Sequence, residues 1–390
     1  MKKNILFISH CASRTGAPII LLHLLRWLKK NTDFTITILL KKDGVLKSEF
    51  EEIGETYVWD KTPSQNLFQL ILKKFLPQTN NRSKKNILKV FPQKNFNLIY
   101  ANTVATCETV DEIANMINCP KICHVHELEI ALNEFCGKDV FIRSDIYFDE
   151  YIVVSKAVRE NLINSYNIKE NKIKLIYGFI HNHTNYSYSI KPVFNKNTIR
   201  NELSLSSDTI IIGACGTTDW RKAPDVFIQL AHATKRMAKN NKIVFCWIGG
   251  EDRGVVYDKL IYDIKKLNLS DQVFFMGSKT KPFDYFNDFD IFTLTSREDP
   301  FPLVCLEAAS LEKPVICFDK AGGISEFVEE DAGFVVPYLD INAMAEKIIL
   351  LAEDKVLREH LGNRAAEKVR EMHDIHTSAQ KLLTIINRYL

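Results

Sequence analysis

The sequence has no apolar run long enough to cross a bilayer. Its longest run, APIILLHLLRWL, is interrupted by His23 and Arg26 and is shorter than the roughly 20 residues that a spanning helix needs. The apolar stretch at the N-terminus ends at His10, too early for the hydrophobic region of a signal peptide. We therefore expect neither membrane insertion nor export, and a cytoplasmic location follows.

The sequence also lacks a pattern of paired cysteines. Its nine cysteines are an odd number without a C-x-x-C motif, which favours free thiols in a reducing compartment. Cys119, Cys123, His124 and His126 form C-x3-C-H-x-H, a combination of the usual zinc ligands. On a strand, however, Cys123 and His124 point to opposite faces, so structural cysteines and one functional histidine are favoured over a zinc site.

Glycine is scarce where a dinucleotide-binding protein needs it. The loop after the first predicted strand reads SHCASRTGAP and contains a single glycine, Gly16. The G-x-G-x-x-G fingerprint is therefore absent, which argues against a nicotinamide- or flavin-dependent oxidoreductase.

Acidic residues are absent between Lys61 and Cys107. Two interpretations stay open for this stretch: a basic, aromatic-bearing surface for peripheral contact with anionic lipid headgroups, or a solvated lysine-rich loop and helix. Nucleic acid is not the expected partner, because the net charge is only +3. The basic residues are Lys61, Lys73, Lys74, Arg82, Lys84, Lys85, Lys89 and Lys94, and the apolar residues are Phe68, Leu72, Phe75, Leu76, Ile87, Leu88 and Phe91.

Short β-rich apolar runs alternate with longer helical patterns along the 390 residues. Strands buried on both faces have this composition, so the pattern predicts parallel sheets covered by helices. The length suits two cores, and we expect two Rossmann-like, doubly wound α/β domains at 1–190 and 205–370, joined near 186–206. A helical stretch at 371–390 is free to pack back on the N-terminal domain.

The segment SREDPFPLVCLEAAS, residues 296–310, predicts a helix that starts without a side-chain cap. Pro302 suits the first helical position, which makes Phe301 the expected N-cap and leaves amides from Leu303 onward free for an anion. Glu307 shares a helix face with Leu303 and Val304, and its carboxylate leans back toward the helix start. A carboxylate is suited to accept hydrogen bonds from sugar hydroxyls rather than to bind phosphate.

Two acids precede this helix. Asp299 lies eight residues before Glu307 and is placed to reach a second set of hydroxyls. The alternative is that Glu298 and Asp299 only complement the helix dipole, a contribution of about 0.3 to 1 kcal/mol.

These segments resemble the donor site of the family 4 glycosyltransferases, which have the GT-B fold. In that family an E-x7-E motif precedes G-G-x-x-E, and the second glutamate, here Glu307, binds the ribose of a sugar nucleotide. The first glutamate maps onto Asp299, a shorter carboxylate, and contacts the transferred sugar. G-G-x-x-E maps onto Gly322, Gly323 and Glu326.

The resemblance extends upstream through IIIGACGTTDWRKAPDVFIQLA, residues 210–231. In the family an arginine and, five residues later, a lysine neutralise the donor diphosphate. Lys222 fills the lysine position, and lysine is a compact charge for phosphate. Thr217 stands where the arginine is expected, so half of this clamp is missing and Arg221 is the candidate substitute.

In the N-terminal half, SRTGAPIILLHLL resembles the glycine-bearing loop of the family, where the backbone at Gly16 approaches the donor phosphate or the acceptor. The alternative is a plain strand-to-helix turn. KICHVHELE resembles the segment of the active-site histidine, here His126, which orients a hydroxyl of the sugar. The D-x-D formed by Asp288 and Asp290 is discounted as a metal site, because it lies between a helix and a strand.

The resemblance implies a GT-B enzyme whose two domains face a cleft. Such an enzyme transfers a sugar from a UDP- or GDP-linked donor to a glycan or polyprenyl-linked glycan, with retention of configuration, without metal or cofactor, in bacterial surface polysaccharide synthesis. Catalytic roles fall to His126, Lys222 and Asp299. The alternatives are a sugar-nucleotide epimerase or phosphorylase of the same fold, or a non-catalytic subunit that binds sugar nucleotides.

Overall fold

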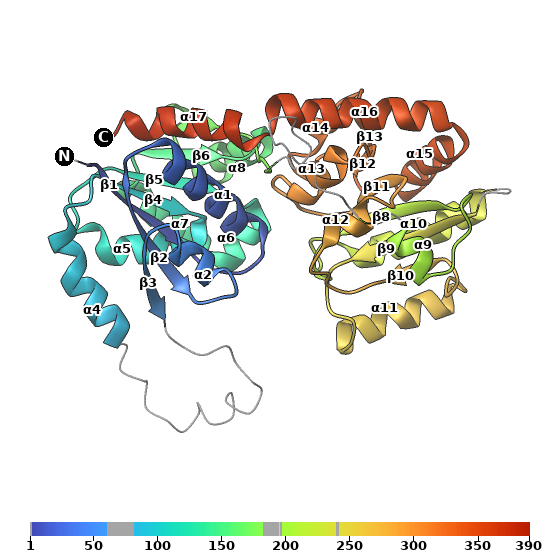
Figure 1. Cartoon of the computed structure of the whole chain (residues 1–390), viewed down its shortest axis with the longest axis horizontal. Coiled ribbons are helices and arrows are strands. Elements are labelled where there is room, and N and C mark those ends of the chain that lie inside the picture. The colour runs from blue at the N-terminus through green and yellow to red at the C-terminus, as the bar shows by residue number, and fades with distance from the viewer. Residues whose placement is uncertain (1, 61–81, 182–194, 196, 239–241) are drawn as a thin grey trace, which may run out of the picture. The chain divides into compact units, whose positions relative to one another are not determined.

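The computed structural model describes residues 2–60, 82–181, 195, 197–238 and 242–390 (Figure 1). The chain divides into two compact units, each a parallel sheet with helices packed against it. The first comprises Met1–Val154, Val158–Ile176 and Ser378–Leu390, and the second comprises Ser155–Ala157 and Tyr177–Thr377. Residues 186–194 and 196 of the predicted linker lie outside the described residues.

The first unit is built on a seven-stranded parallel sheet in the order β3-β2-β1-β4-β5-β6-β7. Strands β4, β5 and β6 are buried at every residue, which confirms the prediction of strands covered on both faces. The strands are β1 Asn4–Ser9, β2 Thr35–Lys42, β3 Glu55–Asp60, β4 Leu98–Asn102, β5 Lys121–Val125, β6 Glu150–Val153 and β7 Ile173–Leu175.

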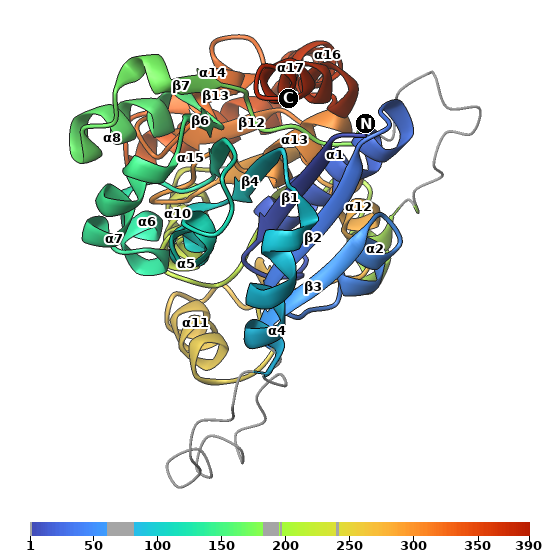
Figure 2. The ribbon, with the colours of Figure 1, turned by 90° about the vertical axis from the view of Figure 1, so that its left-hand side faces the viewer.

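Helices of the first unit connect these strands. Helix α4 packs along the edge strand β3, where the Ser83 hydroxyl donates to the carbonyl of Val58 (Figure 2). The α-helices are α1 Gly16–Asn31, α2 Lys47–Glu51, α4 Arg82–Val90, α5 Cys107–Ala114, α6 Glu129–Phe135, α7 Lys138–Ser144 and α8 Lys156–Tyr166. Short 3-10 helices are η1 Phe91–Lys94, η2 Val104–Thr106, η3 Asp145–Tyr147 and η4 Glu170–Lys172.

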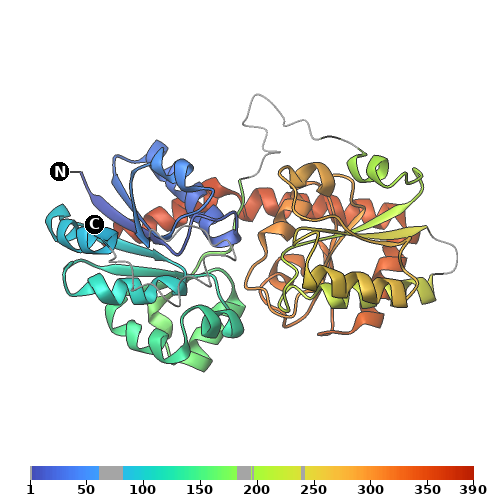
Figure 3. The same cartoon turned by 90° about the horizontal axis from the view of Figure 1, so that it is seen from below.

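The second unit has a six-stranded parallel sheet in the order β10-β9-β8-β11-β12-β13, with helices on both faces (Figure 3). Its strands are β8 Ile210–Cys215, β9 Ile243–Ile248, β10 Val273–Phe275, β11 Ile291–Leu294, β12 Val315–Phe318 and β13 Gly333–Val336. Its helices are α9 Thr198–Glu202, α10 Pro224–Met237, α11 Val255–Lys266, α12 Pro282–Phe286, α13 Leu303–Ser310, α14 Ser325–Val328, α15 Ile341–Glu353 and α16 Lys355–Met372.

Most of the last helix, α17 (Ile375–Asn387), belongs to the first unit, which includes residues Ser378–Leu390. Arg388 donates to both carboxylate oxygens of the buried Glu150, at 2.9 and 2.8 Å. No helix in the described part of the chain is both long and apolar enough to span a membrane.

Both sheets reverse their strand order at one point, between β1 and β4 in the first unit and between β8 and β11 in the second. In open α/β sheets the loops that follow the strands at such a point form the binding site. The loops after β8 and β11 contain Lys222 and Asp299, and the loop after β1 leads to Gly16. The topology therefore places the predicted residues where this fold binds ligands.

Candidate functional site

The loop after β8 is organised by Asp219. Its carboxylate accepts from the amides of Arg221 at 2.9 Å and Lys222 at 3.2 Å, and it also accepts from the hydroxyl of Thr217. Thr217, in the position expected for an arginine, therefore shapes the loop through Asp219. Asp219 itself was not predicted, and its sequence signal was weak: an aspartate in a loop between a strand and a helix, whose side chain can accept from the amide two residues later.

Lys222 and Asp299 come together in the second unit. The aliphatic part of Lys222 passes close to Gly216, where a Cβ would lie 3.3 Å from its Cγ and Cδ. Its ammonium forms an ion pair with the carboxylate of Asp299. Asp299 is 5% exposed, and the Ser296 hydroxyl lies 3.5 Å from the same carboxylate oxygen. Two loops that follow different strands thus meet in one charged contact.

Arg221 also joins these two loops. Its carbonyl accepts from the amide of Arg297 at 2.7 Å, and its guanidinium donates to the carbonyl of Glu298 at 3.4 Å. From the other loop, the guanidinium of Arg297 donates two hydrogen bonds, of 3.0 and 2.7 Å, to the carboxylate of Asp225 and one, of 3.1 Å, to the carbonyl of Trp220. Arg221 and Lys222, two cations of the loop after β8, thus both contact the loop after β11.

A glycine allows the Asp299 loop to approach the next loop. The amide of Asp299 donates to Ala321 at 2.7 Å, and the amide of Gly323 donates to Pro300 at 3.0 Å. Gly322 has a φ of +142°, and a Cβ there would lie 1.7 Å from the carbonyl oxygen of Asp299. Only glycine fits this position, which explains the first part of the G-G-x-x-E pattern.

The helix start differs by one residue from the prediction. Pro302 is the N-cap, with an extended ψ of 116°, and Leu303 rather than Pro302 is the first helical residue of α13. The prediction of Phe301 as the N-cap is therefore wrong. As expected, however, no side chain caps the helix, and no acid lies in its first turn. The amides of Leu303 and Val304 therefore lie in the uncapped first turn of α13.

The Phe301 side chain is buried in a cluster of rings. It stacks on His373 with centroids 5.3 Å apart and lies 5.6 Å from the ring of Tyr177. Gly178 accommodates it, since a Cβ there would lie 2.6 Å from Phe301 Cδ1. The predicted donor contact at Phe301 is thus limited to its main chain.

Glu307 lies in α13 near the end of β8. Burial raises its pKa from 4.5 to about 7. Burial and the nearby Glu307 carboxylate together raise the pKa of Cys215, the last residue of β8, to about 12. No cation among the described residues forms an ion pair with Glu307, so the carboxylate is available to a ligand.

Glu326 of the G-G-x-x-E pattern accepts main-chain hydrogen bonds. Its two carboxylate oxygens each accept one, from the amides of Lys156 and Ala157, both at 3.0 Å. These amides belong to the short segment Ser155–Ala157 that groups with the second unit. The glutamate of the G-G-x-x-E pattern therefore has a structural role, because it binds these two main-chain amides.

His126 follows β5 in the first unit. Its Nε2 lies 3.0 Å from Oδ1 of Asn102, and its amide donates to Glu127 at 2.9 Å. Burial, followed by the neighbouring His124 and His10, holds the pKa of His126 well below 6.5. Burial and these neighbours therefore favour the neutral imidazole of His126.

Gly16 is the first residue of α1, after an extended Thr15 that gives no side-chain cap. The first turn of α1 contains no acid. Asn102 donates to the carbonyl of Ala17 in that turn, at 3.0 Å, and so connects the start of α1 with His126. The structure thus brings Gly16 and His126 into one region of the first unit.

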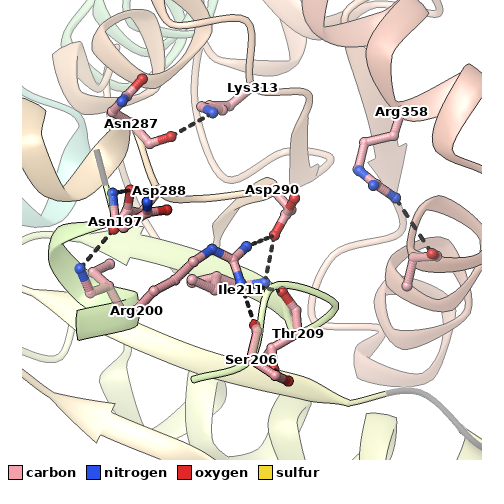
Figure 4. Close-up of polar contacts among 12 residues, drawn as sticks. Asn197, Arg200, Ser206, Thr209, Ile211, Asn287, Asp288, Asp290, Lys313 and Arg358 are labelled. Carbon is pink, nitrogen blue, oxygen red and sulfur yellow. Dashed lines mark hydrogen bonds and ion pairs between the residues drawn. The ribbon is translucent and has the colours of Figure 1, made fainter. Parts of the chain in front are cut away.

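Asp288 and Asp290, the D-x-D residues that were discounted as a metal site, accept hydrogen bonds from main-chain amides (Figure 4). Asp288 accepts from the amides of Asn197 and Ile199, both at 2.7 Å, at the start of α9. Asp290 accepts from the amide of Ile211 at 2.9 Å and from Arg200 at 3.2 Å. Among the described residues, no cluster of three or more histidine, cysteine or acidic side chains is arranged to hold a metal ion.

The basic stretch is described only from residue 82, so Lys61, Phe68, Leu72, Lys73, Lys74, Phe75 and Leu76 lie outside the described residues. In the described part Ile87 and Phe91 are in the core, which contradicts their assignment to a surface. Lys84 pairs with Glu112 and Lys94 with Glu55. Lys85 and Lys89 are exposed on α4.

The chain is similar in sequence to known glycosyltransferases. Residues 195–368 match the family described as glycosyl transferases group 1. The poly(ribitol-phosphate) alpha-N-acetylglucosaminyltransferase of Staphylococcus aureus (strain COL) is 32% identical over 167 residues, 43% of this chain and 33% of that protein. The capsular polysaccharide biosynthesis glycosyltransferase CapM of Staphylococcus aureus is 26% identical over 257 residues, 66% of this chain and 63% of that protein.

The match therefore spans less than two thirds of the length of each of these two relatives. Among solved structures, Anabaena HepE in complex with UDP-glucose superposes with a TM-score of 0.79 at 20% identity, covering 99% of each chain. At this identity the likeness establishes the fold alone.

Proposed function

Because residues 195–368 match the group 1 glycosyl transferases and the chain has the GT-B fold, we propose that this protein is a glycosyltransferase of bacterial surface glycan assembly. It moves a sugar from a nucleoside diphosphate sugar to a hydroxyl of a glycan. The observation that carries this proposal is the meeting of Lys222 and Asp299 in the second unit, which also contains the uncapped start of α13 and Glu307.

The second unit supplies charge stabilisation. When the nucleoside diphosphate leaves, negative charge builds on its phosphates. Lys222 and the amides at the start of α13 are positioned donors for that charge, and helix N-termini favour anions. An ammonium has three N–H groups, so Lys222 can donate to phosphate and to Asp299 at once. The loss of one preorganised donor typically lowers the rate by about 10² to 10³.

The carboxylates supply recognition of hydroxyls. Glu307, without an ion-pair partner in the described part of the chain, accepts from the ribose, and Asp299 accepts from the transferred sugar. Because aspartate is one methylene shorter than glutamate, Asp299 reaches less far, and the donor sugar has to fit that shorter reach. Arg221 takes the role of the missing arginine at Thr217.

For the donor we favour a UDP-sugar, with a GDP-sugar as the alternative. The support is indirect: the structurally similar Anabaena HepE holds UDP-glucose. We further propose retention of configuration and transfer without a metal ion. The support for transfer without a metal is that the carboxylates of Asp288 and Asp290 already accept hydrogen bonds from main-chain amides, while Lys222 and the start of α13 offer positive charge and free amides to the phosphates in this proposal.

For the acceptor we propose a glycan or a polyprenyl-linked glycan. The support is the names of the Staphylococcus aureus relatives, which concern poly(ribitol-phosphate) and capsular polysaccharide. Contact with the inner face of a membrane through residues 61–107 remains part of this proposal. Sedimentation with anionic vesicles tests it, and failure to bind at low salt would remove that part.

A non-catalytic subunit that binds sugar nucleotides is the second candidate, because Thr217 replaces a phosphate-binding arginine. The experiment that separates the candidates is incubation with UDP- and GDP-sugars and an acceptor panel. A transferase releases free nucleoside diphosphate together with a glycosylated acceptor. An epimerase converts the sugar nucleotide, a phosphorylase consumes inorganic phosphate, and a binding subunit leaves the donor intact.

A further inference from the structure

The proton position on His126 can be read from its neighbours. Asn102, at the end of β4, places its amide oxygen 3.0 Å from Nε2 of His126. The amide group of Asn102 is oriented by a second contact, because its nitrogen donates to the carbonyl of Ala17 at 3.0 Å. A carbonyl accepts only, so the Asn102 oxygen, and not its nitrogen, must face the histidine.

An amide oxygen cannot donate a hydrogen bond. Nε2 of His126 therefore carries a proton, and in a neutral ring Nδ1 carries a lone pair. Nδ1 has no hydrogen-bond partner in the part of the chain that the structure describes, and the side chain is only partly buried. The ring thus presents an acceptor to a ligand.

The surroundings keep this ring neutral. The His124 ring lies 4.0 Å away, centroid to centroid, and Tyr100 is 2.7 Å from Nδ1 of that histidine. His10, in the loop after β1, is close enough to lower the pKa of His126 further. Among the residues that the structure describes, Glu127 has a carboxylate in contact with His126, and it accepts from the amides of His126 and Val104 at 2.9 and 3.3 Å.

We propose that Asn102 is a positioning residue that fixes His126 as the neutral tautomer protonated at Nε2, so that Nδ1 accepts a hydrogen bond from a sugar hydroxyl. This inference rests on the proposed function for the identity of the ligand, but its tautomer part does not. A sugar without a hydroxyl at that position would lose this contact. Asn102 acts through His126 and does not itself touch the substrate.

The test is long-range ¹H–¹⁵N NMR of the full chain labelled with ¹⁵N-histidine, which distinguishes protonated from unprotonated ring nitrogens. The His126 signals are assigned by their absence in His126→Gln. We expect Nε2 protonated and Nδ1 unprotonated from pH 6 to 8 in the wild type. A doubly protonated ring, or a proton on Nδ1, overturns the proposal whether or not the protein proves to be a transferase.

Two variants separate positioning from a structural role. Asn102→Asp places a carboxylate on Nε2, which favours the doubly protonated ring, removes the Nδ1 acceptor and lowers turnover about tenfold, the value of one hydrogen bond. Its pH profile should recover toward high pH, where the ring loses its second proton. Asn118→Asp, an exposed change in the same unit, should alter neither spectrum nor profile.

An Asn102→Asp spectrum identical to that of the wild type would overturn the role of Asn102. If that variant does not fold, Asn102→Ala takes its place, and a single Nε2-protonated ring in it would contradict the proposal equally.

Discussion

The burial of Glu307 lowers the stability of the folded protein when its carboxylate is ionised. Burial raises its pKa from 4.5 to about 7, so between these two pH values the folded protein retains a proton that the unfolded chain releases. The free energy of unfolding therefore falls as pH rises through this window, and the loss is complete above about pH 7. A carboxylate kept under these conditions is consistent with a ligand-binding role.

Replacing Glu307 by glutamine should remove this pH dependence. We expect Glu307→Gln to match the wild type in urea unfolding at pH 5 and to exceed it by about 1 to 3 kcal/mol at pH 8. Glu330→Gln, a change at an exposed glutamate, is the control and should have no effect at either pH. Equal destabilisation by Glu307→Gln at both pH values would show that ionising the buried carboxylate does not lower the free energy of unfolding.

At the residue scale, some site members were readable from the sequence and others were not. The eight-residue spacing selected Asp299 over Glu298, and the structure pairs Asp299 with Lys222. Asn102 could not be found, because its role depends on β4 and β5 lying side by side, with Asn102 opposite His124. Asp219 acts within a turn, where hydrogen bonds to the next amides leave only a weak sequence signal.

At the element scale, the contact between the loops after β11 and β12 depends on one glycine. Gly322→Ala combines a φ of +142° with a Cβ placed 1.7 Å from the Asp299 carbonyl oxygen. We expect a loss of about 3 kcal/mol or more in the free energy of unfolding, because backbone strain and steric overlap add.

Gly137→Ala is the matched control for this prediction. Gly137 has a φ of +84°, but no atom lies within 4 Å of its Cβ position, so only left-handed strain of about 1 to 2 kcal/mol is expected. Chemical denaturation of both variants measures the difference. Equal losses would mean that the close approach at Asp299 contributes nothing.

Elements were predictable where burial was complete on both faces. Strands such as β1 and β12 stand out as continuous apolar runs. Strands β3 and β7 lack this signal, and both are edge strands of the first sheet. Strand β3 mixes charged and apolar residues, and β7 is three residues long. The start of α13 was misplaced by one residue because Pro302 takes an extended ψ, which the residue type alone does not reveal.

At the scale of the whole molecule, we propose that the sugar nucleotide binds to the second unit, the part that matches the group 1 glycosyl transferases. Its direct test is thermal unfolding with a panel of UDP-, GDP- and dTDP-sugars. A ligand at a hundred times its Kd stabilises by about 2.7 kcal/mol, which corresponds to a rise in Tm of about 5 °C or more.

We predict that one nucleotide class raises the Tm of the wild type and of Lys259→Ala, an exposed control. Lys222→Ala should lower the Tm of the free protein, because the buried Asp299 loses its ion-pair partner, and should lose most of the rise that the ligand causes. A panel in which no sugar nucleotide shifts the wild type, or an undiminished shift in Lys222→Ala, would contradict the assignment of the donor site.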